Sequence, residues 1–295
     1  MEFEATIRGN SYSEKTPLRA KNVMRRIAQL GHKCPPVLRL GLATRDDTRL
    51  EAEDVAYAVG RGVNYLNWCG RDDALAEALR EQRFDREKVV IAFQLEGRTK
   101  RAAAHELAKA LETLQTNRID VVTFYYVEKP EEWEEITRPG GAMEAIEAAR
   151  QSSKVRLRGL TTHQRAFGAD LIDSGKLDLL MIRYNAAHRG AEQDVFPVTD
   201  QRAIPVVAFT AQRWGALREH TVGDPAGFSP PPASAWYRLA LQNPSVSVVL
   251  MAPLNRRELD EDLALLDDWR PPRAEELETM LEHGARVRKY ASRFP

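Results

Sequence analysis

Short runs of β-forming residues alternate with helical patterns along most of the chain, and this alternation constrains the fold more than any other feature. Eight runs have the composition of buried strands, and they cover residues 38–42, 65–67, 89–94, 119–126, 155–161, 177–184, 206–209 and 246–251. Stretches with helical 3.6-residue spacing lie between most of them, at residues 51–59, 73–82, 100–114, 142–150, 165–172, 234–241 and 257–266. Eight βα units in one chain predict an α/β fold, a single-domain (β/α)8 TIM barrel.

The domain boundaries follow from the same pattern. Residues 1–36 are polar and form an N-terminal extension, and residues 37–295 form the barrel together with a last helix at about 274–290. Two stretches, 128–141 and 220–232, have the composition of loops. Loops that follow barrel strands shape the mouth of the barrel, where binding sites lie.

A doubly wound open sheet is the alternative fold, and the glycine pattern argues against it. Such a sheet usually has a Gly-x-Gly-x-x-Gly turn directly after an early strand, which seats a pyrophosphate. The chain has no such turn: Gly60-Arg61-Gly62 precedes a strand, and Gly97-Arg98-Thr99-Lys100 lacks the remaining glycine of a phosphate-binding loop. Both segments are interpreted as turns.

Composition and charge narrow the class of ligand. Lys plus Arg equals Asp plus Glu, at 43 each, and neither sign forms a long block. We therefore expect a small-molecule substrate, with no nucleic acid and no membrane as partner. Two cysteines, no apolar run of signal-peptide length and no metal-ligand spacing predict a cytoplasmic protein without a metal site. The oligomeric state stays open.

Several motifs, in their order along residues 39–266, resemble the aldo/keto reductases. The stretch GVNYLNWCGRDDALAEAL at 62–79 is similar to the second strand and following helix of that family. KVRLRGLT at 154–161 resembles its fifth strand, RYN at 183–185 the end of its sixth, and VVAFT at 206–210 its seventh. The resemblance implies a barrel that binds a nicotinamide cofactor, NADP, and reduces a small carbonyl compound.

The catalytic positions implied by this resemblance carry other residues. The family uses a Tyr as proton donor, beside a Lys, an Asp and a His. Asn67 stands at the Asp position, Gln94 at the Lys position and Tyr125 at the His position, and the loop that would carry the Tyr is shorter. The period of two along the strands nevertheless predicts that these three side chains point into the barrel.

Tyr125 and His163 are the candidate groups for proton transfer. Tyr125 closes the fourth strand and His163 follows the fifth, so we expect the hydroxyl and the imidazole to face one cavity. Asn67 and Gln94 would be their neutral hydrogen-bonding partners. The alternative interpretation is that Tyr125 only caps a polar pocket and that His163 is a hydrogen-bonded loop residue.

Cofactor contacts are predicted from the resemblance at the ends of strands five, seven and eight. Phe209 could stack on a nicotinamide, and the loop after it resembles the one that covers a pyrophosphate. Two arginines that open a helix could clamp a phosphate, or could form a solvated face. The predicted cofactor-binding residues are Thr161, Thr162, Phe209, Thr210, Gln212, Arg213, Asn255, Arg256 and Arg257.

Three functional hypotheses remain, because a fold does not determine a function. The first is a nicotinamide-dependent oxidoreductase with a substituted catalytic tetrad and a non-standard acid. The second is a non-redox enzyme, such as an isomerase, lyase or cyclase, built on Tyr125 and His163. The third is a pseudoenzyme that binds a ligand without turnover.

Overall fold

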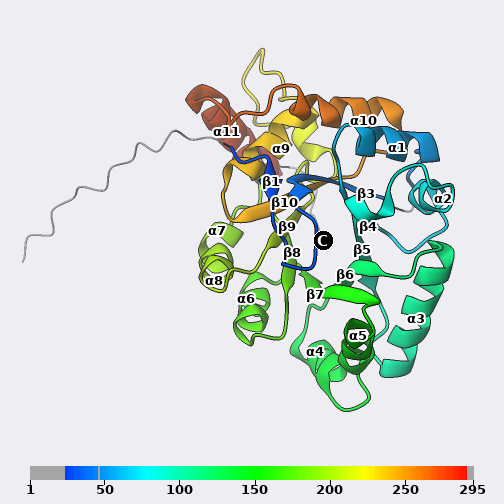
Figure 1. Cartoon of the computed structure of the whole chain (residues 1–295). Coiled ribbons are helices and arrows are strands. Elements are labelled where there is room, and N and C mark those ends of the chain that lie inside the picture. The colour runs from blue at the N-terminus through cyan, green and yellow to red at the C-terminus, as the bar shows by residue number, and fades with distance from the viewer. Residues whose placement is uncertain (1–23, 46, 291–295) are drawn as a thin grey trace, which may run out of the picture.

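The structure is a computed structural model of the chain, and it describes residues 24–45 and 47–290. Eight parallel strands close into a barrel in the order β10, β3, β4, β5, β6, β7, β8, β9 (Figure 1). Their bounds are β3 Leu40–Ala43, β4 Tyr65–Trp68, β5 Val90–Leu95, β6 Ile119–Phe124, β7 Val155–Thr162, β8 Leu179–Arg183, β9 Val206–Phe209 and β10 Val246–Met251. The single-domain (β/α)8 barrel predicted from the sequence is confirmed.

Helices surround the ring of strands (Figure 1). In α3, for example, Thr99 caps the first turn, and Ala103, Leu107 and Ala110 form a buried stripe. The α-helices are α1 Ala52–Gly60, α2 Ala74–Arg80, α3 Lys100–Thr113, α4 Pro130–Thr137, α5 Ala142–Gln151, α6 Arg165–Asp173, α7 Ala191–Asp194, α8 Phe196–Gln201, α9 Ala233–Gln242, α10 Arg256–Leu263 and α11 Ala274–Tyr290. Three 3₁₀ turns are η1 Arg86–Lys88, η2 Ala216–Arg218 and η3 Ala264–Leu266.

Alternate residues of each strand fill the barrel interior, as the period of two predicts. Tyr65, Ala92 and Val121 belong to one buried cluster inside the ring. Asn67 lies two residues after Tyr65, and Gln94 lies two residues after Ala92, so both face inward at the carboxyl ends of their strands. The strand parity on which the site prediction depends is therefore correct for these two residues.

Two segments differ from the secondary structure expected from the sequence. The stretch 128–141 is largely helix α4 and not a loop, because Pro130 occupies the first helical turn and Trp133 and Ile136 bury an apolar edge. Helices α7 and α8, which the sequence pattern did not indicate, connect β8 to β9. The stretch 220–232 contains no helix or strand, as predicted.

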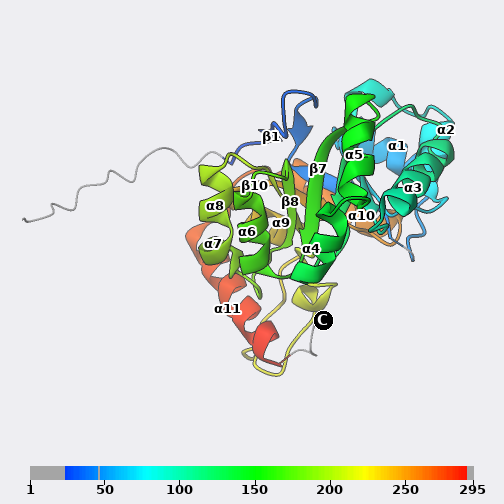
Figure 2. The same cartoon turned by 90° about the horizontal axis from the view of Figure 1, so that it is seen from below.

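The described part of the N-terminal extension forms a small hairpin at one end of the barrel. Strands β1 Ile27–Ala28 and β2 Val37–Leu38 pair antiparallel. Leu30 and Cys34, in the connection between them, join the cluster that fills the barrel interior. Figure 2 shows β1 at the end opposite the last turns of α11. The remainder of the predicted extension, residues 1–23, lies outside the described residues.

Helix α11 packs beside α9 at the other end of the barrel (Figures 1 and 2). His283 is fully buried, and its ring nitrogens lie 2.9 Å from Asp224 Oδ1 and 3.2 Å from the carbonyl oxygen of Leu217. These contacts hold α11 against η2, whose neighbours line the candidate site. Within the described residues, none of the helices has the length and apolar character needed to cross a membrane.

Candidate functional site

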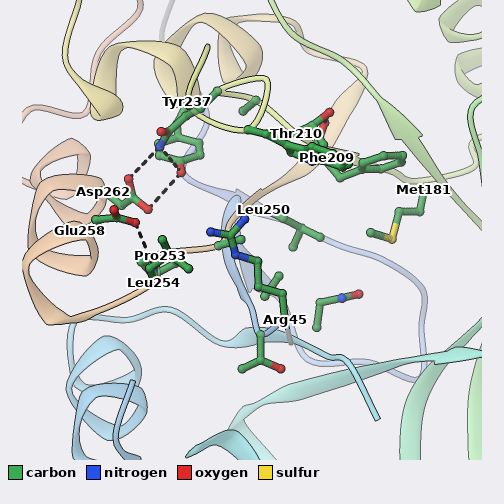
Figure 3. A pocket seen from close by; sticks show the side chains of 18 of the residues that line it. Arg45, Met181, Phe209, Thr210, Tyr237, Leu250, Pro253, Leu254, Glu258 and Asp262 are labelled. Carbon is green, nitrogen blue, oxygen red and sulfur yellow. Dashed lines mark hydrogen bonds between the residues drawn. The ribbon is translucent and has the colours of Figure 1, made fainter. Parts of the chain in front are cut away.

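A cavity of about 280 Å³ lies at the mouth formed by the carboxyl ends of the strands. Its inner wall includes Asn67, Gln94, Met181 and Phe209, which come from four different strands. Its outer wall comes from the loop after β9 and from the loop and helix after β10. In Figure 3, Phe209 and Thr210 lie along one side, Tyr237, Asp262 and Glu258 lie along another, and Arg45 reaches into the space between them.

Two neutral amides lie on the inner wall. Asn67 is 3% exposed, and its Oδ1 has no hydrogen-bond partner among the described residues. The amide nitrogen of Gln94 lies 3.7 Å from the sulfur of Met181, a weak acceptor. Both side chains therefore reach the cavity, as predicted, and both offer polar atoms that the protein itself leaves poorly satisfied.

Of the two tyrosines that follow β6, Tyr126 lines the cavity and Tyr125 does not. Strand β6 ends at Phe124, so the strict alternation of sides stops there. Tyr126 then adopts a left-handed backbone with φ of 41°, which places its ring on the wall. Tyr125 stacks against it, with ring centroids 4.1 Å apart. Burial and the Tyr125 side chain raise the pKa of Tyr126 above its ordinary value.

His163 extends this aromatic group away from the cavity. Its ring lies 4.6 Å from that of Tyr126 and 5.5 Å from that of Phe209. Glu128 accepts a hydrogen bond from the backbone N–H of His163 and lies 3.2 Å from its Nδ1. Burial lowers the pKa of His163, although Glu128 opposes this shift. The rings of Tyr125 and His163 therefore both pack against Tyr126. Neither Tyr125 nor His163 is among the residues that line this cavity.

The two threonines at the end of β7 point to opposite sides of the barrel. Thr161 is fully buried, lies on the inward face two residues after Gly159, and its Oγ1 has no partner among the described residues. Thr162 faces helix α6: its Oγ1 accepts the backbone N–H of Gln164, and its methyl group lies against Gly168. Only Thr161 is therefore oriented toward the barrel interior.

The end of β9 and the loop after it contain four further predicted cofactor contacts, of which three line the cavity. Phe209, Thr210 and Gln212 belong to its wall. The Gln212 amide donates to the Tyr237 hydroxyl at 2.5 Å and to Asp262 Oδ1 at 2.9 Å. Arg213 instead turns toward α11 and is 4% exposed, with its Nη1 3.4 Å from the carbonyl oxygen of Val287.

The residues predicted for a phosphate at the start of α10 are engaged with the protein itself. Asn255 caps the helix by accepting the backbone N–H of Glu258. Arg256 stacks on Tyr57 at 3.8 Å and pairs with Asp54 and Asp260, and Arg257 pairs with Glu261. None of the three is among the residues that line this cavity.

Sequence reasoning missed the acidic group on the outer wall, Asp262 with Glu258. Asp262 is 2% exposed, and its Oδ2 accepts a hydrogen bond from the Tyr237 hydroxyl at 3.0 Å. Burial raises the pKa of the Asp262 carboxyl from 3.8 to about 7. Helical spacing could have indicated this residue, because Asp262 lies on the same face as the apolar Leu259.

No metal centre accompanies these groups in the part of the chain that the structure describes. The described residues contain no set of three or more His, Cys, Asp or Glu side chains arranged to hold a metal ion. The polar groups on the cavity wall include two phenols, three amides, two guanidinium groups and two carboxyl groups, which belong to Tyr126, Tyr237, Asn67, Gln94, Gln212, Arg45, Arg218, Glu258 and Asp262.

Comparison with solved structures shows which known proteins have a similar barrel. Among solved structures, the chain is similar to aldo-keto reductase AKR11C1 from Bacillus halodurans in its holo form, with a TM-score of 0.69, 17% identity, and coverage of 88% of this chain and 96% of that one. It is also similar to PA4992 of Pseudomonas aeruginosa, assigned to the same family, with a TM-score of 0.64, 18% identity, and coverage of 84% and 97%. These likenesses concern the fold.

Sequence comparison gives the family itself. A search of curated proteins finds no match. The model of the Aldo/keto reductase family, however, matches residues 39–243, which is more than half of the chain. Together with the closed parallel barrel, this match shows that the chain belongs to the aldo/keto reductase family.

Proposed function

We propose that the chain is a nicotinamide-dependent oxidoreductase that acts on a small carbonyl compound and uses a non-standard acid. The observation that carries the proposal is that Tyr126 and Phe209 share one cavity with the amides of Asn67 and Gln94. Barrel enzymes place their active sites at this mouth.

The inner wall fits the nicotinamide end of a cofactor. Bound there, the nicotinamide would supply the hydride. Phe209 offers an aromatic ring, and Asn67 Oδ1 is a buried polar atom on this wall without a partner among the described residues. A buried unsatisfied polar group costs about 1–3 kcal/mol, which a hydrogen bond from a bound amide or hydroxyl would recover.

Tyr126 is the residue that can give a proton to the substrate oxygen. Its hydroxyl is protonated at neutral pH, as in any tyrosine, and can donate a hydrogen bond to a carbonyl, although the raised pKa makes it a weaker acid than an ordinary tyrosine. Among the described residues that line the cavity there is no lysine, and Asn67 and Gln94 carry no charge. The charge of Arg183 favours the phenolate that must follow, but burial outweighs it and raises the pKa of Tyr126. We therefore expect turnover well below the enzyme median of about 10 s⁻¹.

The test is a fluorescence titration of the purified protein with NADH and with NADPH, followed by a panel of aldehydes and ketones. Trp214 lies on the cavity wall and is 62% exposed, so a bound nicotinamide should quench its emission. We expect quenching by at least one cofactor, weakened in Phe209→Ala. Absence of binding by both cofactors in the folded protein would refute the proposal.

A second candidate function is ligand binding without turnover. It is favoured because several residues predicted to contact the cofactor form hydrogen bonds or ion pairs within the protein instead. Gln212, Arg256 and Arg257 already have partners within the protein. Saturable binding of a small molecule, with no reaction above the rate without protein, would support this candidate. A non-redox enzyme built on Tyr125 and His163 has less support, because neither residue lines the cavity.

A further inference from the structure

The outer edge of the cavity, formed by Glu258 and Asp262 of α10, carries carboxylates that only neutral groups satisfy. Asp262 accepts hydrogen bonds from Gln212 and Tyr237. Glu258 Oε2 accepts the backbone N–H of Leu254 at 2.9 Å. Among the described residues, neither carboxylate has a recorded ion pair with a cation. We call Glu258 and Asp262 the acidic edge.

The two arginines on the cavity wall form their ion pairs with acids other than Glu258 and Asp262. Arg218 lines the cavity and lowers the pKa of Asp262 somewhat, but its ion pair is with Glu261 at 2.6 Å. Arg45, which points into the cavity in Figure 3, has Asp47 3.0 Å from its Nε. The acidic edge therefore holds two carboxyl groups that are not ion-paired among the described residues, while Arg45 and Arg218 lie elsewhere on the cavity wall.

A separate observation indicates that the cavity is built to hold a ligand. Asn67 is 3% exposed, lines the cavity, and has an Oδ1 without a partner among the described residues. It lies on the inner wall, whereas Asp262 and Glu258 lie on the outer wall. An extended ligand held by Asn67 at one end therefore meets the acidic edge at the other.

We propose that the acidic edge makes this site select NADH over NADPH, an inference that rests on the proposed oxidoreductase function. Carboxylates accept hydrogen bonds from the two hydroxyls of an unmodified ribose, whereas a ribose phosphate requires arginine or another cation. The guanidinium groups of Arg256 and Arg257 contact Asp54, Asp260 and Glu261, and neither arginine lines the cavity. A ribose phosphate would instead face two carboxylates, and like charges repel strongly at a partly buried site.

The experiment compares binding of NADH and NADPH by calorimetry and by Trp214 fluorescence at pH 8, in the wild type and in Glu258→Gln and Asp262→Asn. Both variants keep an acceptor oxygen and remove a charge. We expect the wild type to prefer NADH by at least about tenfold and each variant to reduce that preference by about tenfold. Asp267→Asn is the control, since Asp267 is exposed, pairs with Arg61 and lies outside the residues that line the cavity.

Two fragments separate this inference from the proposed function. AMP has a free 2′-hydroxyl, 2′,5′-ADP carries a phosphate there, and neither contains nicotinamide. Equal or tighter binding of NADPH and of 2′,5′-ADP in the wild type would overturn the inference while the oxidoreductase proposal stands. Binding of AMP alone, without either cofactor, would support the acidic edge and refute the oxidoreductase proposal. A preference for NADH that the two cavity variants leave unchanged would also overturn the assignment to Glu258 and Asp262.

Discussion

The buried carboxyl group of Asp262 should make the stability of the protein depend on pH, and Asp262→Asn should remove that dependence. The folded protein binds the proton of Asp262 more tightly than the unfolded chain, because burial raises its pKa from 3.8 to about 7. Between these two values the folded state holds more protons at this position, so the free energy of unfolding falls as pH rises. A full shift of about three pKa units corresponds to ~4 kcal/mol, at 1.36 kcal/mol per unit.

The stability is lost gradually between pH 3.8 and about pH 7, the pKa values of the unfolded and the folded state. The interval from pH 5.5 to pH 8 therefore contains a measurable part of the loss. Linkage over that interval gives a change of about 2 kcal/mol from this one group. Asparagine carries no charge and can still accept from Gln212 and contact Tyr237. The free energy of unfolding of Asp262→Asn, minus that of the wild type, should therefore increase by about 2 kcal/mol from pH 5.5 to pH 8.

Urea unfolding followed by far-UV circular dichroism at four pH values measures this difference. Tyr237→Phe gives a second variant with an expected direction, because the Tyr237 hydroxyl lowers the pKa of Asp262. Without that hydroxyl the pKa should rise further, and the stability of Tyr237→Phe should fall more steeply with pH above 7 than that of the wild type. A difference between Asp262→Asn and the wild type that stays constant across the pH range would refute the reasoning.

Three further predictions concern the aromatic group and the packing of α11. Tyr126→Phe keeps the ring on the cavity wall and removes its proton, so any carbonyl reduction should fall at least about a hundredfold in steady-state assays; an unchanged rate would remove Tyr126 as the acid. Tyr125→Phe and His163→Ala should each lower the same rate by less than about tenfold, because neither side chain lines the cavity, and a larger loss would restore the site expected from the sequence. Gly284→Ala should destabilise the fold by about 1–3 kcal/mol in urea titrations, since a Cβ there would lie 2.6 Å from the backbone of Ala186; an unchanged unfolding midpoint would contradict this packing.

The sequence alone was enough to predict the barrel and part of its inner wall. Strand composition and helical spacing repeat eight times, and a period of two decides which side of a strand faces inward. This period correctly predicts that Asn67 and Gln94 point into the barrel, because both lie within regular strands in which successive side chains alternate between the two faces.

Only the tertiary structure decided which side chains meet beyond the strand ends. Tyr126 replaces Tyr125 on the cavity wall because a left-handed backbone after β6 breaks the alternation, and no strand period encodes that turn. Helix α4 forms in a segment that was predicted as a loop because Trp133 and Ile136 find an apolar surface to cover. Such contacts join residues far apart in the chain, so they cannot be predicted from local secondary-structure propensity.

The charge of the site shows the same division. Arg256 and Asp262 are equally visible as charged residues in the sequence, and both lie on helix α10. Whether a charge is available to a ligand depends on its partners: Asp54, which is 202 residues away in sequence, engages Arg256, whereas Asp262 is buried beside Gln212 and Tyr237 with no cation paired to it among the described residues. The residues that surround a charge in the folded protein decide whether a ligand can reach it. Only the folded structure therefore reveals that the outer edge of the cavity is acidic.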